Sequence, residues 1–109
     1  MAKNDYFRIV FIILKFLYEN MKKGNIDIPI DEVIKKSNIP DIPQQYFDEI
    51  IKNLINEEYI DYIGESVQFI HDSSPRMTIE SIKIKPKGIE YLQENSMMKK
   101  IAKIIETVK

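Results

Sequence analysis

The amino-acid sequence predicts an α+β fold that is mostly α-helical. The most informative stretch is residues 82–95, which reads IKIKPKGIEYLQEN. Residues 82–85 alternate between isoleucine and lysine, and such alternation is typical of a half-buried strand. After the Pro-Lys-Gly step of residues 86–88, Ile89 and Leu92 recur at a helical spacing. The chain therefore passes directly from a strand into a short helix.

Length and composition limit the class of protein. The chain has 109 residues, of which 44% are hydrophobic and 30% are charged, as in ordinary globular proteins. We therefore expect residues 1–109 to form a single domain. The absence of cysteine excludes disulfides and thiolate metal sites. Sixteen Lys and Arg against 17 Asp and Glu give a net charge of −1, so any phosphate-binding surface must come from local clustering.

The first predicted helix begins near Asp5, which can cap it, and ends before Gly24. Residues 9–14 are all apolar, and further apolar residues on both sides leave only a narrow polar strip. Such a helix is buried on several sides, and part of that burial could come from a second subunit. The apolar run is too short to cross a bilayer, Asp5 and Arg8 lie close to it, and the start of the chain lacks a small-residue cleavage site. We therefore expect neither a signal peptide nor a membrane span.

A very short strand and a short helix come next. Residues 26–28 alternate between apolar and polar types and are followed by Pro29, which cannot continue a strand ladder. Residues 31–36 fit a helix of about two turns. Its acidic residues lie in the first turn and its lysines, Lys35 and Lys36, in the last, which matches the helix dipole.

A third helix, longer than the one before it, is predicted over about residues 43–57, after a break at residues 37–40. Asp41 and Gln44 resemble a capping box at its start. Five residues recur at helical spacing and should face the core: Phe47, Ile50, Ile51, Leu54 and Ile55.

An antiparallel hairpin and two C-terminal helices complete the chain. We expect the hairpin between about residues 59–85, with a polar turn at residues 71–76. Residues 86–95 should be helical, and a final helix should cover about residues 96–108. The predicted order of elements is that of a winged helix-turn-helix: helix, short strand, helix, turn, helix, two strands and helix. Here the fold has additional C-terminal helices.

Three segments carry a resemblance to a known family. They are residues 28–34 (IPIDEVI), residues 54–60 (LINEEYI) and residues 84–92 (IKPKGIEYL). Together they resemble the YjcQ family, small winged-helix proteins of Firmicutes and their phages. The resemblance covers nearly the whole chain. It implies a winged-helix fold and a cytoplasmic setting, and it implies no mechanism.

The helix at residues 43–57 occupies the position that reads the DNA major groove in a helix-turn-helix. Its exposed residues should be Gln44, Gln45, Asp48, Glu49, Lys52, Asn53 and Asn56. Glutamine and asparagine can read adenine edges, so Gln44 and Gln45 are the candidate base contacts, with Lys52 as a DNA-binding cation beside them. The carboxylates of Asp48 and Glu49 repel phosphates and favour the plain alternative, a solvated helix face.

Cations also gather around the predicted hairpin. Arg76, Lys83 and Lys85 are the candidate phosphate contacts there, and each phosphate contact adds affinity without sequence information. The alternative is that these side chains simply occupy the solvent-exposed face of the strands, where lysines discourage edge-to-edge pairing of sheets.

The sequence does not predict an enzyme. His71 is the only histidine, it has no cysteine or carboxylate cluster nearby, and no nucleophile stands beside it. The three glycines do not form a phosphate-binding loop. We therefore expect no catalytic site, no metal site and no cofactor.

Two functions follow from these patterns, together with a weaker third. The first is a DNA-binding regulator of transcription, of bacterial or phage origin, and the alternative is a non-enzymatic protein–protein interaction module that does not bind DNA. A continuous positive patch joining the hairpin to Lys35, Lys36 and Lys52 would favour the first. The third is a ligand-responsive sensor, because aromatic residues such as Tyr6 and Phe7 gather at the first helix. A homodimer through the first and last helices is one expectation, and the equal alternative is that these two helices pack on each other within one subunit.

Overall fold

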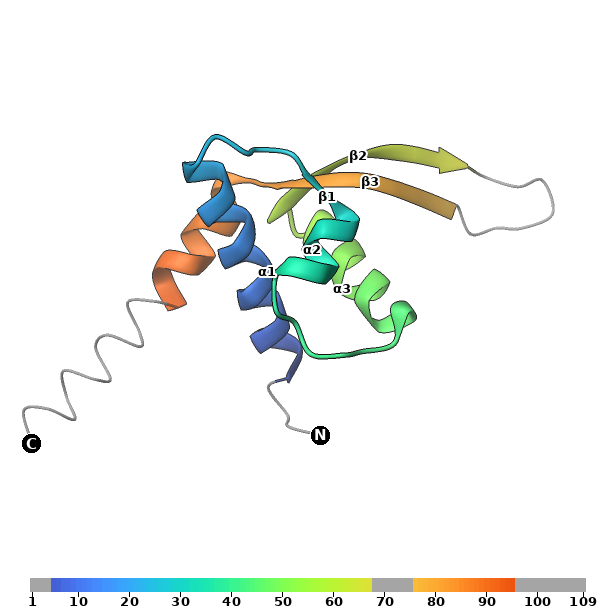
Figure 1. Ribbon diagram of the computed structural model, residues 1–109, viewed down its shortest axis with the longest axis horizontal. Coiled ribbons are helices and arrows are strands. Elements are labelled where there is room, and N and C mark those ends of the chain that lie inside the picture. The colour runs from blue at the N-terminus through green and yellow to red at the C-terminus, as the bar shows by residue number, and fades with distance from the viewer. Residues whose placement is uncertain (1–4, 68–75, 96–109) are drawn as a thin grey trace, which may run out of the picture.

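The computed structural model describes residues 5–67 and 76–95 of the chain. Its elements are α1 (Asp5–Lys22), β1 (Ile28–Pro29), α2 (Ile30–Lys36), α3 (Gln44–Asn56), β2 (Ile60–Val67) and β3 (Arg76–Ile84). Residues 86–95 form a further helix directly after β3 (Figure 1). This order confirms the predicted α+β class, mostly α, with a winged-helix layout. The predicted final helix at about residues 96–108 lies outside the described residues.

The three strands form one antiparallel sheet in the order β1-β3-β2. Ile60 pairs with Ile84 at the base of the hairpin, and Ile28 of β1 pairs with Ile82. Away from this base, β2 and β3 continue well beyond the helices (Figure 1). Their register shifts between Ile63 and Gly64. Glycine is required there because a Cβ on Gly64 would collide with the backbone of β3.

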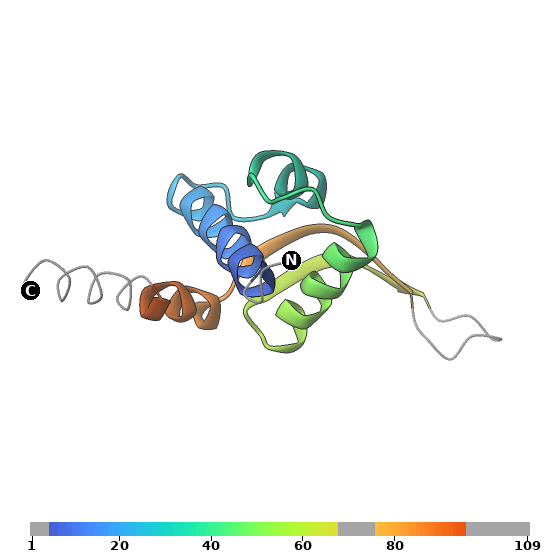
Figure 2. The ribbon, with the colours of Figure 1, turned by 90° about the horizontal axis from the view of Figure 1, so that it is seen from below.

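The core lies between this sheet and the helices, all of which lie on one side of the hairpin (Figures 1 and 2). Its buried apolar residues form one cluster: Ile9, Val10, Ile13, Leu14, Leu17, Ile28, Val33, Phe47, Ile50, Ile51, Leu54, Ile60, Ile82, Ile84 and Leu92. Four of the five residues predicted to face inward from α3 belong to it, and the fifth, Ile55, packs against it partly buried.

Most of the apolar surface of α1 is covered within one chain. Ile9, Ile13 and Leu14 are fully buried, and Val10 and Leu17 are almost so. Phe7, at the start of the helix, is 61% exposed. The internal core therefore accounts for most of the apolar run that suggested a dimer. The homodimer stays a prediction, since its other half rests on residues 96–108. None of the helices in the described residues is long and apolar enough to span a membrane.

The start of α3 differs from the prediction. Pro43 is the N-cap residue, with φ −58° and ψ 144°, and no side chain caps the helix. The predicted capping box between Asp41 and Gln44 is wrong because the helix begins two residues later than that box requires. The Gln44 amide nitrogen instead donates a hydrogen bond of 2.9 Å to Asp48 Oδ1, one turn along the helix.

The Pro-Lys-Gly step after β3 is explained by a close approach between two segments. The backbone nitrogens of Gly88 and Ile89 donate to the carbonyl oxygen of Lys85 and so begin the helix at residues 86–95. Gly88 is buried, and a Cβ there would collide with the carbonyl oxygen of Tyr59. That same oxygen accepts a 2.9 Å hydrogen bond from the backbone nitrogen of Lys85. Glycine at this position therefore lets the helix pack against the segment that follows α3.

Candidate nucleic-acid interface

A groove of about 560 Å³ lies between α2, α3 and β3, and we call it the α3 groove. Its apolar lining is Ile30, Ile34, Phe47, Ile51 and Ile79. Its polar lining is Asp31, Gln44, Gln45, Asp48, Glu49, Lys52 and Thr78. The helix-turn-helix and the sheet thus meet at one concave surface that carries both apolar and charged groups.

Three of the predicted DNA-binding residues meet in this groove. Gln44, Gln45 and Lys52 all lie on α3 and are exposed. Residues four apart on a helix share a face, so Gln44, Asp48 and Lys52 form one row along the groove. Sequence periodicity alone was enough to place these side chains together.

The charge of the groove is mainly negative. Asp31, Asp48 and Glu49 line it with exposed carboxylates, and Lys52 is the single cation among the described side chains that line it. Like charges within a few ångströms repel by about 1 kcal/mol in water, and by more where water is excluded. A phosphate can therefore approach favourably only near Lys52.

The predicted hairpin cations lie elsewhere. Ile82 and Ile84 face the core, so Lys83 between them projects from the opposite face of the sheet, where it stands opposite Asp61. Lys85 Nζ lies 3.9 Å from Glu58 Oε1. Arg76 begins β3, and its side chain lies outside the described residues. The DNA-binding roles of these three residues stay predictions, and Lys83 and Lys85 do not join the α3 groove.

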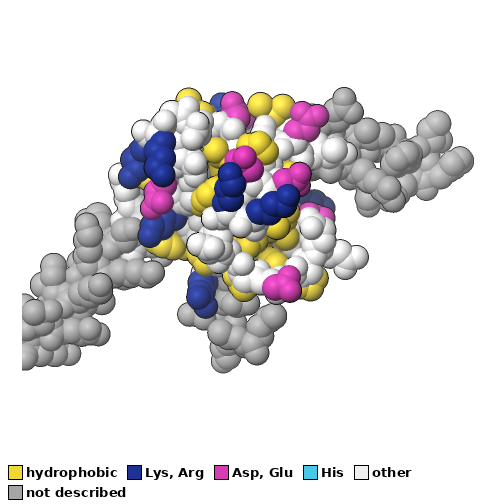
Figure 3. Space-filling view, in the orientation of Figure 1, with side chains coloured by type: hydrophobic (Ala, Val, Ile, Leu, Met, Phe, Trp, Pro, Cys, Tyr) yellow, Lys and Arg dark blue, Asp and Glu magenta, His cyan; other side chains and the backbone are white. Residues whose placement is uncertain are grey.

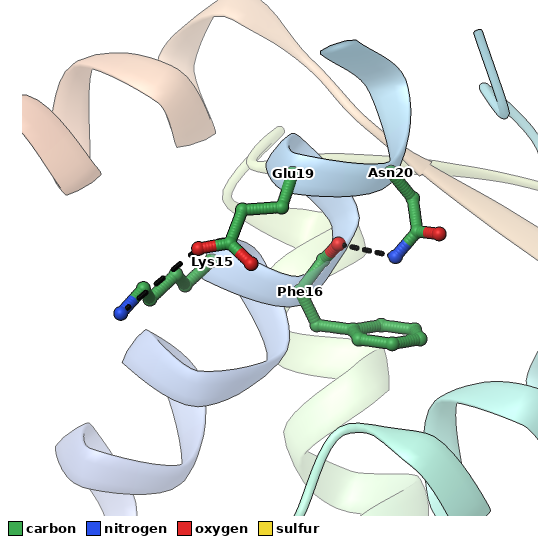
Figure 4. A network of polar contacts seen from close by, with 4 residues as sticks. All are labelled: Lys15, Phe16, Glu19 and Asn20. Atoms are coloured by element: carbon green, nitrogen blue, oxygen red, sulfur yellow. Dashed lines mark hydrogen bonds and ion pairs between the residues drawn. The ribbon is translucent and has the colours of Figure 1, made fainter. Parts of the chain in front are cut away.

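Cations elsewhere on the surface also stand beside acids. Lys36 Nζ lies 3.6 Å from Glu32 Oε1, and Lys15 Nζ lies 4.0 Å from Glu19 Oε1 on the solvent side of α1 (Figure 4). On the face drawn in Figure 3, Lys and Arg side chains alternate with Asp and Glu. The described residues thus present mixed charge on this face rather than the continuous positive patch that would favour DNA binding most strongly.

A second hollow of about 410 Å³ lies at the other end of α3. We call it the aromatic pocket; its lining residues are Tyr6, Phe7, Val10, Asn53, Leu54, Asn56, Glu57, Tyr59 and Tyr91. The sequence suggested Tyr6 and Phe7 as lining of a ligand site, whereas Tyr59 and Tyr91 carry no local signal. Close packing at Gly88 explains their proximity, because it brings two segments distant in sequence together.

Asn53 belongs to this pocket rather than to the exposed face of α3. It was expected to be exposed, but it is half-buried, and its Nδ2 donates a hydrogen bond of 3.0 Å to the Tyr6 hydroxyl oxygen. Burial raises the pKa of the Tyr91 hydroxyl, and the nearby phenols of Tyr59 and Tyr6 raise that pKa further. The surroundings of Tyr91 therefore disfavour its ionised form.

Residues 5–67 and 76–95 contain no group of three or more His, Cys, Asp or Glu residues that could hold a metal ion. His71 lies outside these residues. The α3 groove and the aromatic pocket are therefore the two candidate sites described above that could bind a partner.

Comparison with known proteins gives one result. A family model described as YjcQ protein matches residues 11–109, which include most of α1 and every later element. No curated protein and no solved structure matches the chain. The match spans most of the sequence, and the fold has the winged-helix order that the resemblance implied. The chain therefore belongs to the YjcQ family.

Proposed function

We propose that this is a cytoplasmic DNA-binding winged-helix protein, a regulator of transcription that reads duplex DNA with the start of α3. The observation that carries the proposal is the position of Gln44, Gln45 and Lys52. All three are exposed along one edge of the helix-turn-helix, beside a hairpin that extends past the body (Figure 1). The activity is binding rather than catalysis.

The two glutamines differ in how readily they can read a base. Bidentate recognition of adenine needs both the oxygen and the nitrogen of the amide. The nitrogen of Gln44 already donates one of its two hydrogens to Asp48 Oδ1, and this bond holds the amide beside a carboxylate and restricts its orientation toward a base. The hydrogen bond therefore favours Gln45 as the specificity-determining side chain.

Affinity should be modest and strongly dependent on salt. Lys52 supplies the phosphate contact nearest to the glutamines, while Asp48 and Glu49 oppose it. Each phosphate contact contributes a slope of about −0.9 to the dependence of log affinity on log salt.

The test is to measure duplex binding by fluorescence anisotropy over a range of salt concentrations. Lys52→Ala should weaken binding similarly for all sequences and reduce the salt slope by about one unit. Gln45→Ala should alter the preference between sequences. Lys15→Ala is the matched control, because Lys15 is an exposed α1 lysine paired with Glu19, and it should leave binding unchanged. Absence of salt-dependent binding to any duplex at low ionic strength would reject the proposal.

One observation favours a second function, a protein–protein interaction module. The α3 groove combines three carboxylates with an apolar lining in which Ile34 is 36% exposed. That chemistry suits an amphipathic segment of a partner protein that carries lysine or arginine. Replacing both acids, Asp48→Asn and Glu49→Gln, distinguishes the two functions, because each function predicts the opposite change in binding affinity. The double variant should bind DNA more tightly if DNA is the partner, and should bind a basic peptide less tightly if a protein is.

A further inference from the structure

The aromatic pocket is built from three segments that the core holds in place. Tyr6 and Phe7 come from the start of α1, Asn53 from the last turns of α3, and Tyr91 from the helix at residues 86–95. The hydrogen bond from Asn53 to Tyr6 joins the first two segments. Tyr59 and Tyr91 bring the third close, with ring centroids 5.3 Å apart. The pocket thus has a defined frame, and its volume of about 410 Å³ lies within the range of small-molecule sites.

The rings around this pocket are not stacked. The Tyr6 and Phe7 rings meet edge to face at 83°, and the Tyr59 and Tyr91 rings are tilted by 39°. In neither pair does one ring lie flat on the other, so each keeps a π face that its partner does not cover. Phe7 is 61% exposed, so its ring is accessible at the pocket.

The charge of the pocket has one sign. Within residues 5–67 and 76–95, Glu57 is the only charged residue that lines it, and its side chain is exposed. No lysine or arginine of these described residues belongs to the lining. The negative faces of aromatic rings attract cations placed over them, and a carboxylate at the rim adds to that attraction.

We propose that the aromatic pocket is a binding site for an organic cation, specifically an alkylated ammonium group. The ring faces of Tyr6, Phe7, Tyr59 and Tyr91 would surround the alkyl groups, and Glu57 would face the positive charge. This site lies at the opposite end of α3 from Gln44 and Gln45, so it is independent of the proposed DNA-binding surface.

The experiment compares a cation with a neutral molecule of the same shape. The full-length protein is titrated with choline and, separately, with 3,3-dimethylbutan-1-ol, while the tyrosine and phenylalanine ring signals are followed by NMR. Choline should cause saturable shifts at the four pocket rings, and the neutral alcohol should bind roughly 2- to 30-fold more weakly, which is the range of cation–π contributions. Equal binding of the two would overturn the proposal and leave a purely apolar pocket.

Two variants with matched controls sharpen the test. Glu57→Gln should weaken choline binding by up to about fivefold, whereas Glu49→Gln, about two turns earlier in the α3 groove, should not change it. Phe7→Leu should also weaken binding, and Phe16→Leu should not. The side chains of Glu57 and Phe7 are both exposed at the pocket, so the Glu57→Gln and Phe7→Leu variants should fold. Absence of saturable shifts with choline, or ring shifts that instead follow protein concentration and indicate a second copy as the occupant, would contradict the proposal.

Discussion

The two ends of α3 face different surroundings. At its start, Gln44, Gln45 and Asp48 are exposed beside a mainly acidic groove, with a hydrogen bond only within the helix itself. At its end, Asn53 is half-buried and bonds to α1, and Leu54 is buried in the core. One face of the helix is thus buried in the core from Phe47 to Leu54, while its polar face bonds to α1 at the end and is presented to solvent at the start. Changes of buried or bonded residues should therefore alter stability, and changes of the exposed polar residues at the start should alter binding.

The largest effect on stability should come from shortening a side chain on the buried face of α3. Ile50 is fully buried in the middle of α3. Ile50→Ala should lower the free energy of unfolding by about 2–5 kcal/mol, because it leaves a cavity that the core can only partly close. Urea denaturation measures the loss. Lys52→Ala, two residues away but exposed, should change it by less than about 0.5 kcal/mol. Similar losses for both variants would contradict the division of α3 into buried and presented faces.

The next effect should come from the packing that supports the C-terminal end. Gly88→Ala places a Cβ against the carbonyl oxygen of Tyr59, a backbone atom that cannot move aside without disturbing the end of β3. We expect destabilisation of about 1–3 kcal/mol, as for overpacked cores. Lys87→Ala, at the exposed neighbouring position, is the control. If the unfolding midpoint of the Gly88→Ala variant equals that of the wild type, the close approach is not needed.

A smaller effect should follow from breaking the hydrogen bond between α3 and α1. Asn53→Ala removes the donor to Tyr6 and should lower the free energy of unfolding by about 1 kcal/mol. Asn56→Ala changes the same residue type one turn later at an exposed position, and it should cost less. Thermal unfolding of the two variants side by side measures the difference, and equal costs would show that the bond contributes nothing.

The smallest effect concerns pH. The pKa of Tyr91 is raised in the folded protein, first because of burial and then because of the phenols of Tyr59 and Tyr6. The folded protein therefore holds the Tyr91 proton more tightly than the unfolded chain does. Stability from this source is present below the ordinary tyrosine pKa of about 10 and is lost as the pH rises through the higher folded value. A pH titration followed by ultraviolet absorbance should show one tyrosine that ionises at a raised pH. The Tyr91→Phe variant should lack this ionisation. If the variant titrates like the wild type, the pocket does not perturb Tyr91.

Much of the fold was predictable because it depends on local periodicity. The alternation at residues 82–85 and the helical spacing from Phe47 to Leu54 follow from the geometry of strands and helices, and both were confirmed. The start of α3 was harder. Asp41 matched a local capping pattern, but Pro43 can begin a helix without a side-chain cap, and the sequence does not show which of the two wins.

The site was only partly predictable for a different reason. Gln44, Gln45 and Lys52 share one helix face, so their proximity could be calculated from spacing. Whether Lys83 joins them depends on which face of the sheet it occupies relative to the helices, which is a property of the packed structure. The aromatic pocket depends similarly on two backbone segments meeting at Gly88. Spacing along the chain carries no information on such contacts.

The most direct test of the account is to map duplex DNA on the labelled protein. Backbone and side-chain amide signals are followed by NMR while a DNA duplex is added at low salt. We predict that the signals of Gln44, Gln45, Lys52 and Thr78 shift as DNA is added and return as salt is raised, while the signal of Asn53 in the aromatic pocket stays unchanged. If DNA leaves the start of α3 unperturbed, or perturbs the aromatic pocket instead, then the presented end of α3 is not a DNA-reading surface.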